Sequence, residues 1–131
     1  MQPAVSLDLL AGTFAICRLP PNAAVPEWAA GPGPFLSITR TADELSITAP
    51  EREVPAGVRA ERDYRAFRVR GVLAPELVGI LLSIAEPLAQ AGVSIFAIST
   101  FDTDYVLVKA RDVAVALDAL RGAGHQVAGY A

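Results

Sequence analysis

The fold is decided by residues 69–108, VRGVLAPELVGILLSIAEPLAQAGVSIFAISTFDTDYVLV, because a helical pattern in this stretch is followed directly by two strand patterns. Its apolar residues recur mainly at three- and four-residue steps: Leu77, Val78, Leu81, Ile84 and Leu88. This spacing is typical of a helix with one apolar face. Pro75 suits the first helical position, since proline has no N–H to leave unpaired there. The apolar runs 94–100 and 105–108 flank a short polar turn, so they predict a β-hairpin.

Strand and helix patterns on both sides of this stretch complete one folding unit. A strand is predicted at residues 64–70, where apolar and basic side chains alternate from residue 67 onward. Asp112 is a suitable cap for a second helix. The apolar stripe of that helix contains Val113, Ala116, Leu117 and Leu120. Residues 126–130 predict a last strand. The order β-α-β-β-α-β is ferredoxin-like and predicts four antiparallel strands with both helices on one face.

The first half of the chain repeats this order incompletely. A strand pattern at residues 13–19 is followed by at most a helical turn at 26–30 and then by a hairpin pattern at 35–48. Residues 49–62 contain two prolines and mixed charge, so they predict a linker where the second helix would stand. Residues 5–10 predict an additional strand, which we expect to fill the empty position in the first sheet.

An internal repeat supports this division into two units. In the two hairpin tips, setting Thr39 over Thr100 also sets Asp43 over Asp104, a constant offset of 61 residues. The sequence therefore predicts an α+β fold of two ferredoxin-like units. The incomplete unit with its linker takes residues 1–62, and the complete unit takes residues 63–131.

The composition limits the classes of function. With 131 residues, 53% hydrophobic residues and a net charge of −3, the chain is typical of a globular domain without a general attraction for nucleic-acid phosphates. Cys17 is the only cysteine, which fits a reducing cytoplasm. The first ten residues carry Asp8 and no basic side chain, unlike a signal peptide. No apolar run reaches the roughly 18 residues of a membrane span. We expect a cytoplasmic protein that binds neither nucleic acid nor membrane.

The residue spacing does not support a metal or catalytic site. Asp102 and Asp104 alternate like the start of a calcium loop, but the glycine and glutamate that such a loop requires are missing. His125 is the only histidine and is expected at a helix end or sheet edge, while Cys17 is expected as a small core residue. We therefore expect no enzyme activity, no metal and no cofactor.

Four segments resemble the ACT family of small-molecule effector domains. They are FAICRLPP (14–21), FLSITRTADELSI (35–47), the opening stretch (69–108) and the last helix with GAGH (122–125). The similarity is to the tandem-repeat amino-acid-sensing branch, which includes the CASTOR-type arginine sensors. The resemblance implies that the chain binds an amino acid and works in pairs. It also implies that the ligand lies between two domains, at the loop entering a helix and at a neighbouring strand.

The resemblance assigns the ligand to two groups of residues: Gly71, Val72 and Leu73 in the loop, and Ser99, Thr100, Phe101 and Asp104 in the hairpin. An amino acid needs donors for its carboxylate and acceptors for its ammonium group. The first N–H groups of the helix near Pro75 suit the carboxylate, and Asp104 or Asp102 suits the ammonium. Phe101 is a candidate apolar wall or a stacking surface for a guanidinium. Aspartate and threonine are equally typical of an ordinary hairpin turn, which leaves that interpretation open.

These observations predict a non-catalytic regulatory protein that binds a small effector, an amino acid by resemblance. The binding place is an interface between units or between two copies. We expect a homodimer, because a lone four-stranded sheet leaves its edges and one face uncovered. The alternative is a structural interaction module of the same fold, whose pocket is closed by side chains and which pairs with another protein.

Overall fold

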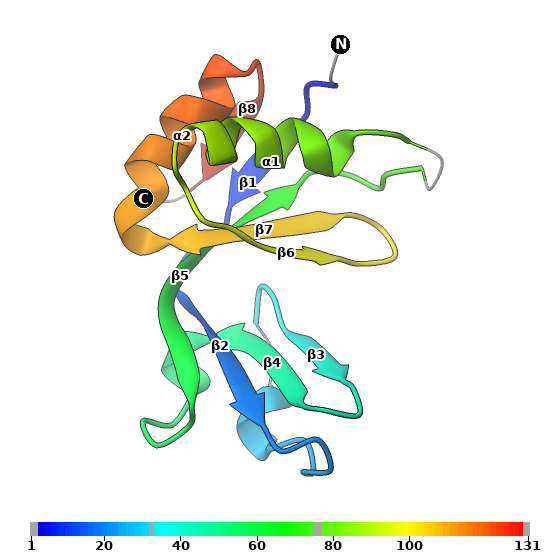
Figure 1. Ribbon diagram of the computed structural model, residues 1–131, viewed down its shortest axis with the longest axis vertical. Helices are drawn as coiled ribbons and strands as arrows, with labels where there is room; N and C mark the ends of the chain where they lie inside the picture. Colours follow the sequence, from blue (N-terminus) through cyan, green and yellow to red (C-terminus); the bar gives the residue numbers. More distant parts are fainter. Residues whose placement is uncertain (1–2, 32, 75–76, 130–131) are drawn as a thin grey trace. The chain divides into compact units, whose positions relative to one another are not determined.

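The computed structural model describes residues 3–31, 33–74 and 77–129 (Figure 1). The chain divides into two compact units, and each is described by itself. We call Met1–Ala11 together with Arg65–Ala131 the helical unit, and Gly12–Tyr64 the strand unit. Strand β5 (Ala60–Val69) belongs to both, because the chain passes from one unit to the other within it. The division predicted after residue 62 falls within this same strand.

The helical unit has the predicted α+β fold. Its elements after β5 are α1 (Ile80–Gln90), β6 (Phe96–Ser99), β7 (Asp104–Lys109), α2 (Val113–Gly122) and β8 (Gln126–Gly129). A short 3-10 turn at Ala110–Asp112 leads into α2. Strands β6 and β7 form the predicted antiparallel hairpin, in which Ser99 lies opposite Asp104. The order β-α-β-β-α-β is therefore confirmed.

Both helices cover the same face of this sheet, because alternate strand residues point toward them. The buried core contains Phe67 and Val69 of β5 and Val106 and Val108 of β7. The helices add to this core the apolar residues Ile80, Ile84, Leu88, Ala116 and Leu120. Burial of such apolar surface is the main favourable term in folding, so this one cluster fixes the helices on the sheet.

Helix α1 starts later than the sequence predicted. Its first residue is Ile80, and the preceding Gly79 has a φ of 85°, a left-handed conformation that glycine adopts at little cost. Leu77 and Val78, which the spacing assigned to the buried stripe, precede the helix and are exposed. Pro75 and Tyr130, predicted at the helix start and in the last strand, lie outside the described residues.

The N-terminal strand lies elsewhere than predicted. Strand β1 (Ser6–Leu9) belongs to the helical unit, where it pairs antiparallel with β5 and parallel with β8. The sheet of this unit therefore has five strands, in the order β6–β7–β5–β1–β8, instead of four. Leu7 and Leu9 explain the placement, because they alternate with polar residues and join the core beneath the helices.

The strand unit is a smaller antiparallel sheet. Its strands are β2 (Phe14–Leu19), β3 (Ser37–Arg40), β4 (Leu45–Pro50) and the first part of β5, in the order β3–β4–β2–β5. Short 3-10 turns lie at Glu27–Ala29 and Glu51–Glu53. The hairpin and the single turn predicted before it are confirmed. The linker predicted at 49–62 is wrong at both ends, because β4 extends to Pro50 and β5 already starts at Ala60.

Cys17 is a core residue of the strand unit, as expected from its place in a strand pattern. It is buried in a cluster with Leu45 and Ile47. Burial raises the pKa of its thiol, because the charged thiolate loses its hydration in apolar surroundings. The thiol therefore stays protonated at neutral pH and is a poor nucleophile.

Asp8 forms two ion pairs on the sheet face that points away from the helices. Its Oδ1 lies 2.5 Å from Arg70 Nη2, and its Oδ2 lies 3.1 Å from Arg68 Nη2. The hydrogen bond from Arg70 is the main cause that lowers the pKa of the Asp8 carboxyl. Strand β1 therefore supplies the acid that pairs with these two arginines of β5 and its end.

The lowered pKa of Asp8 predicts a pH dependence of stability. Its contribution is present above the unfolded-state pKa of about 3.9 and is lost as the pH falls through the lower folded-state pKa. We expect Asp8→Asn to lower the free energy of unfolding at pH 7 and to flatten its decline as the pH falls below about 4. Urea denaturation across this range measures both effects, with exposed Asp118→Asn as the control. An unchanged pH dependence in Asp8→Asn would contradict the assignment.

His125 follows the end of helix α2, as expected, and its backbone N–H donates to the Leu120 carbonyl at 3.1 Å, but its side chain lies inside the helical unit. The side chain is buried just before β8. Its Nδ1 accepts a hydrogen bond from the Val5 N–H at 3.1 Å, and its Nε2 lies 2.7 Å from the carbonyl oxygen of Ser83 in α1. This pattern assigns the neutral tautomer with the proton on Nε2. The ring thus links the N-terminal segment, helix α1 and the start of β8.

We expect His125→Phe to destabilise the helical unit. Phenylalanine fills a similar space, but it leaves the buried partners at Val5 and Ser83 without their hydrogen bonds, at a cost of about 1–3 kcal/mol each. Chemical denaturation should show a loss of roughly 2 kcal/mol or more, while the exposed neighbour Gln126→Ala should be nearly neutral. A loss in His125→Phe no larger than in this control would refute the structural role.

Candidate ligand-binding site

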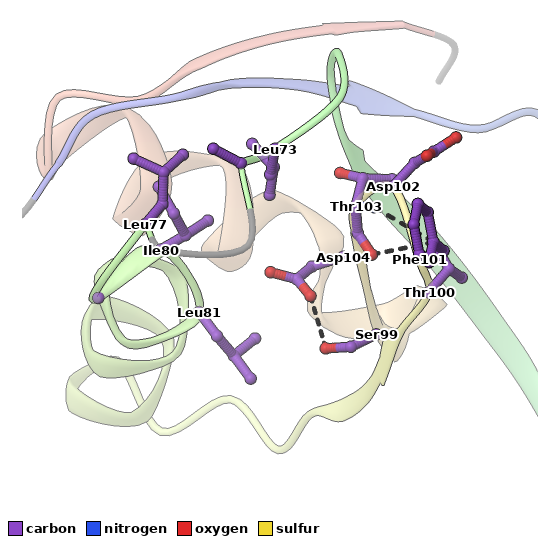
Figure 2. Close-up of a pocket in the computed structure, with 12 residues that line it drawn as sticks. Leu73, Leu77, Ile80, Leu81, Ser99, Thr100, Phe101, Asp102, Thr103 and Asp104 are labelled. Atoms are coloured by element: carbon purple, nitrogen blue, oxygen red, sulfur yellow. Dashed lines mark hydrogen bonds between the residues drawn. The ribbon is translucent and has the colours of Figure 1, made fainter.

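A cavity of about 320 Å³ lies in the helical unit, between the segment that enters α1 and the tip of the β6–β7 hairpin (Figure 2). One side is formed by Leu73, Ala74, Leu77, Gly79, Ile80 and Leu81. The other side is formed by Ser99, Thr100, Phe101, Asp102, Thr103 and Asp104. This volume is at the lower end of the roughly 300–1,000 Å³ that is usual for small-molecule sites.

The hairpin tip is held by two threonines. The Thr100 N–H donates to the Thr103 carbonyl at 2.8 Å, and the Thr103 N–H donates back to Thr100 Oγ1 at 3.2 Å. Side-chain oxygens that accept from nearby backbone N–H groups are a common way to close a turn. The Thr100 hydroxyl is therefore used by the turn itself, as the ordinary-hairpin interpretation expected.

Two further hydrogen bonds connect this tip to the loop on the other side of the cavity. The Leu73 N–H donates to the Asp102 carbonyl at 2.7 Å. The Thr103 hydroxyl donates to the carbonyl of Val69, the last residue of β5, also at 2.7 Å. Because these bonds join the hairpin to the end of β5 and to the segment that follows it, the two sides of the cavity are held at a defined separation at this end.

Asp104 is the polar group that faces the cavity. It begins β7 on the same side of the strand as Val106 and Val108, and therefore points toward the helical face of the sheet. The Ser99 hydroxyl donates to Asp104 Oδ1 at 2.5 Å across the hairpin. Figure 2 shows the carboxylate turned toward the aliphatic side chains opposite. Within the described part of the chain its second oxygen, Oδ2, makes no hydrogen bond.

The start of α1 provides the complementary group. Gly79 has no side chain to accept a hydrogen bond, so the first turn of the helix has no side-chain cap. The unpaired N–H groups and the helix dipole make such a start favourable for an anion. The sequence placed this group near Pro75, with Ala74 as the uncapped residue. The structure places the same physical feature about one turn later, at Gly79 and Ile80, beside the cavity.

Most of the residues assigned to the ligand by resemblance lie around this cavity. Leu73, Ser99, Thr100, Phe101 and Asp104 line it. Gly71 and Val72 are exposed and are not among the lining residues. The Phe101 ring is 96% exposed and points away from the leucine side chains (Figure 2), so it does not form the apolar wall that the sequence suggested.

Apart from Leu73, the actual apolar wall was not assigned to a site from the sequence. It consists of Leu73, Leu77, Ile80 and Leu81. The periodicity assigned Leu77 and Leu81 to the packed stripe of α1. A signal was nevertheless present, because Gly79 interrupts the pattern and moves the helix start past Leu77.

Metal and membrane sites receive no support from the described residues. Among them, no group of three or more His, Cys, Asp or Glu side chains is arranged to hold a metal ion. None of the helices in residues 3–31, 33–74 and 77–129 is long and apolar enough to cross a membrane.

A β-α-β-β-α-β unit with a small cavity at the start of its first helix is typical of the ACT class of regulatory domains, and the sequence agrees. The family model described as "ACT domain" matches residues 59–122, and a second model, described as an N-terminal domain, matches residues 12–57. No match is found among curated protein sequences.

Solved structures extend the relationship to nearly the whole chain. The crystal structure of protein Atu0741 from Agobacterium tumefaciens is 40% identical, covers 98% of this chain and 96% of its own, and superposes with a TM-score of 0.92. The chain belongs to the same family as this protein, and its residues 59–122 match the ACT domain model.

More distant structures show the fold alone. VC0802 from Vibrio cholerae is 20% identical, with a TM-score of 0.73 over 92% of this chain and 90% of its own. The regulatory subunit of aspartate kinase from Thermus flavus is 15% identical, with a TM-score of 0.58 over 93% of this chain and 97% of its own. The predicted ferredoxin-like fold is therefore shared with the regulatory subunit of aspartate kinase.

The hydrogen bond from Thr103 to Val69 gives a test of the cavity's construction. Thr103→Val keeps the shape of the side chain but removes the hydroxyl and leaves the Val69 carbonyl without this bond, at a cost of about 1 kcal/mol. We expect faster amide hydrogen exchange at Leu73 and Thr103, with little change in the core amides of α2. Equal protection in the variant and the parent at these two amides would show that the bond does not hold the tip.

Proposed function

We propose that this chain is a non-catalytic, cytoplasmic regulatory protein whose helical unit binds a free amino acid in the cavity between the hairpin tip and the start of α1. The observation that carries the proposal is the Asp104 carboxylate. It is oriented by Ser99, faces a wall of aliphatic side chains, and has one oxygen available to a ligand. The ACT domain match and the likeness to regulatory subunits agree with this role.

The two ends of an amino acid fit two places in the cavity. An ammonium group placed at Asp104 Oδ2 forms a charge-assisted hydrogen bond, one of the stronger polar contacts available. The carboxylate then points toward the uncapped first turn of α1 at Gly79 and Ile80, where the helix dipole is favourable. The proposed binding role resides in the unit predicted at residues 63–131, and the incomplete unit at 1–62 is proposed to support it structurally.

A homodimer would complete the site. Several apolar side chains near the cavity are exposed: Val72 by 76%, Leu77 by 53%, Val78 by 87% and Phe101 by 96%. In addition β6, which forms the hairpin with β7, is the last strand on its side of the helical unit's sheet. We propose that a second copy covers this region and that Gly71 and Val72 reach the ligand in that assembly. An effector then acts by binding one arrangement of the dimer more tightly than another.

The same exposed apolar side chains favour a second candidate function. A structural module that pairs with a different protein also needs an apolar surface of this kind. Pairing with another protein does not require a carboxylate that is oriented toward an aliphatic wall. We therefore prefer small-molecule binding.

Thermal unfolding in the presence of each of the twenty amino acids tests the proposal. A ligand that binds the folded chain alone raises the midpoint, by a free energy of about 2.7 kcal/mol at a hundred times its dissociation constant. We expect a rise with a subset of the amino acids at millimolar concentration. Asp104→Ala should abolish this rise while the midpoint without ligand is retained. A flat response to all twenty would eliminate amino-acid binding and favour the interaction module.

The neighbouring aspartate provides a matched control. Asp102 lies two residues away in the same hairpin tip, but its carboxylate points away from the leucine side chains (Figure 2). We expect Asp102→Ala to keep the ligand-induced rise. Equal losses in the two variants would show that the tip matters only through its net charge or its folding.

A further inference from the structure

The charges around the cavity indicate which amino acids it accepts. Of the two carboxylates among the described lining residues, Asp104 points inward and Asp102 points outward (Figure 2). The described lining residues include no lysine, arginine or histidine. Among its described residues, the cavity therefore offers one inward side-chain partner for a cation and no basic side chain for an anion.

The opposite wall determines what the ligand's side chain must be. Leu73, Leu77, Ile80 and Leu81 offer only aliphatic surface. A charged group placed against them loses hydration without gaining a partner, which is strongly unfavourable. A neutral aliphatic side chain gains from the same contact, because it leaves water for an apolar surface.

The α-ammonium and α-carboxylate groups of the ligand use the polar groups of the cavity. Asp104 is the one inward carboxylate among the described lining residues, so an α-ammonium group at this position leaves no second one of them for a side-chain cation. The N–H groups of the uncapped turn at Gly79 suit the α-carboxylate. Once they bind it, the described lining residues offer no comparable anion-binding group for an acidic side chain. The size agrees, because about 320 Å³ holds a single small metabolite and little more.

We infer that the cavity is selective for an α-amino acid with a neutral aliphatic side chain, of the size of valine, leucine or isoleucine, and that it discriminates against both basic and acidic amino acids. This inference rests on the proposed function and goes beyond it in naming the ligand class. Asp104 determines that the ligand carries an ammonium group, Ser99 positions Asp104, and the four aliphatic side chains determine that the rest is uncharged.

Isothermal titration calorimetry of the full chain provides the test. The ligands are valine, leucine and isoleucine against lysine, arginine, aspartate and glutamate. We expect at least one aliphatic amino acid to bind tenfold or more tightly than any of the four charged ones. If a charged amino acid binds as tightly as the best aliphatic one, the selectivity inference is overturned and the proposed function survives. If the full set of twenty amino acids fails to bind, both are overturned.

A charge-introducing variant tests the wall itself. Leu77 lines the cavity and is 53% exposed, whereas Leu82 lies in α1, is 54% exposed and is not among the lining residues. Leu77→Glu adds a second carboxylate to the cavity, and we expect the affinity for lysine and arginine relative to leucine to rise tenfold or more. Leu82→Glu adds the same charge outside it and should leave the preference unchanged. The same preference in the parent and in Leu77→Glu would overturn the aliphatic wall as the basis of selectivity.

Discussion

The hydrogen bonds that connect the hairpin tip to the end of β5 are the constraint on which the site depends. Thr103 and Leu73 join two segments about thirty residues apart in sequence, through the Val69 and Asp102 carbonyls. Without them the tip is a hairpin end with side chains in solvent. With them, the carboxylate of Asp104 is held opposite the start of α1, and a hollow remains between the two.

Much of the fold can be predicted from the spacing of apolar residues in the sequence, because the core of the helical unit requires apolar side chains at regular intervals. Leu7, Phe67, Val106 and the apolar stripes of both helices alternate as their elements require, and they meet in one buried cluster. The position of β1 in the sheet could not be predicted from this spacing. A strand of four residues with alternating apolar side chains fits either sheet equally well, and only the pairing of Leu7 with Val69 and with Val127 decides between them.

From the sequence, most of the polar lining of the cavity was named as candidate ligand contacts, whereas of the apolar wall only Leu73 was named. Asp104 and Ser99 stand out because polar residues in a strand pair need an explanation. Leu77 and Leu81 do not, since leucine at helical spacing is expected in a core. Only the left-handed Gly79 shifts the helix start, and this leaves the first leucine as a wall of the cavity. The buried bonds of His125 were equally invisible, because they join residues 120 and 42 positions apart.

The insertion of β1 between β5 and β8 has a consequence for how the protein acquires its structure. The sheet of the helical unit cannot be completed until β8 has been synthesised, although the position beside β8 is taken by β1, which comes far earlier in the sequence. Contacts such as Asp8 with Arg68 span 60 residues, and pairings this distant in sequence are associated with slow folding. A fragment that starts at residue 63 would lack the strand that separates β5 from β8, so the helical unit cannot be excised as one continuous segment of the chain.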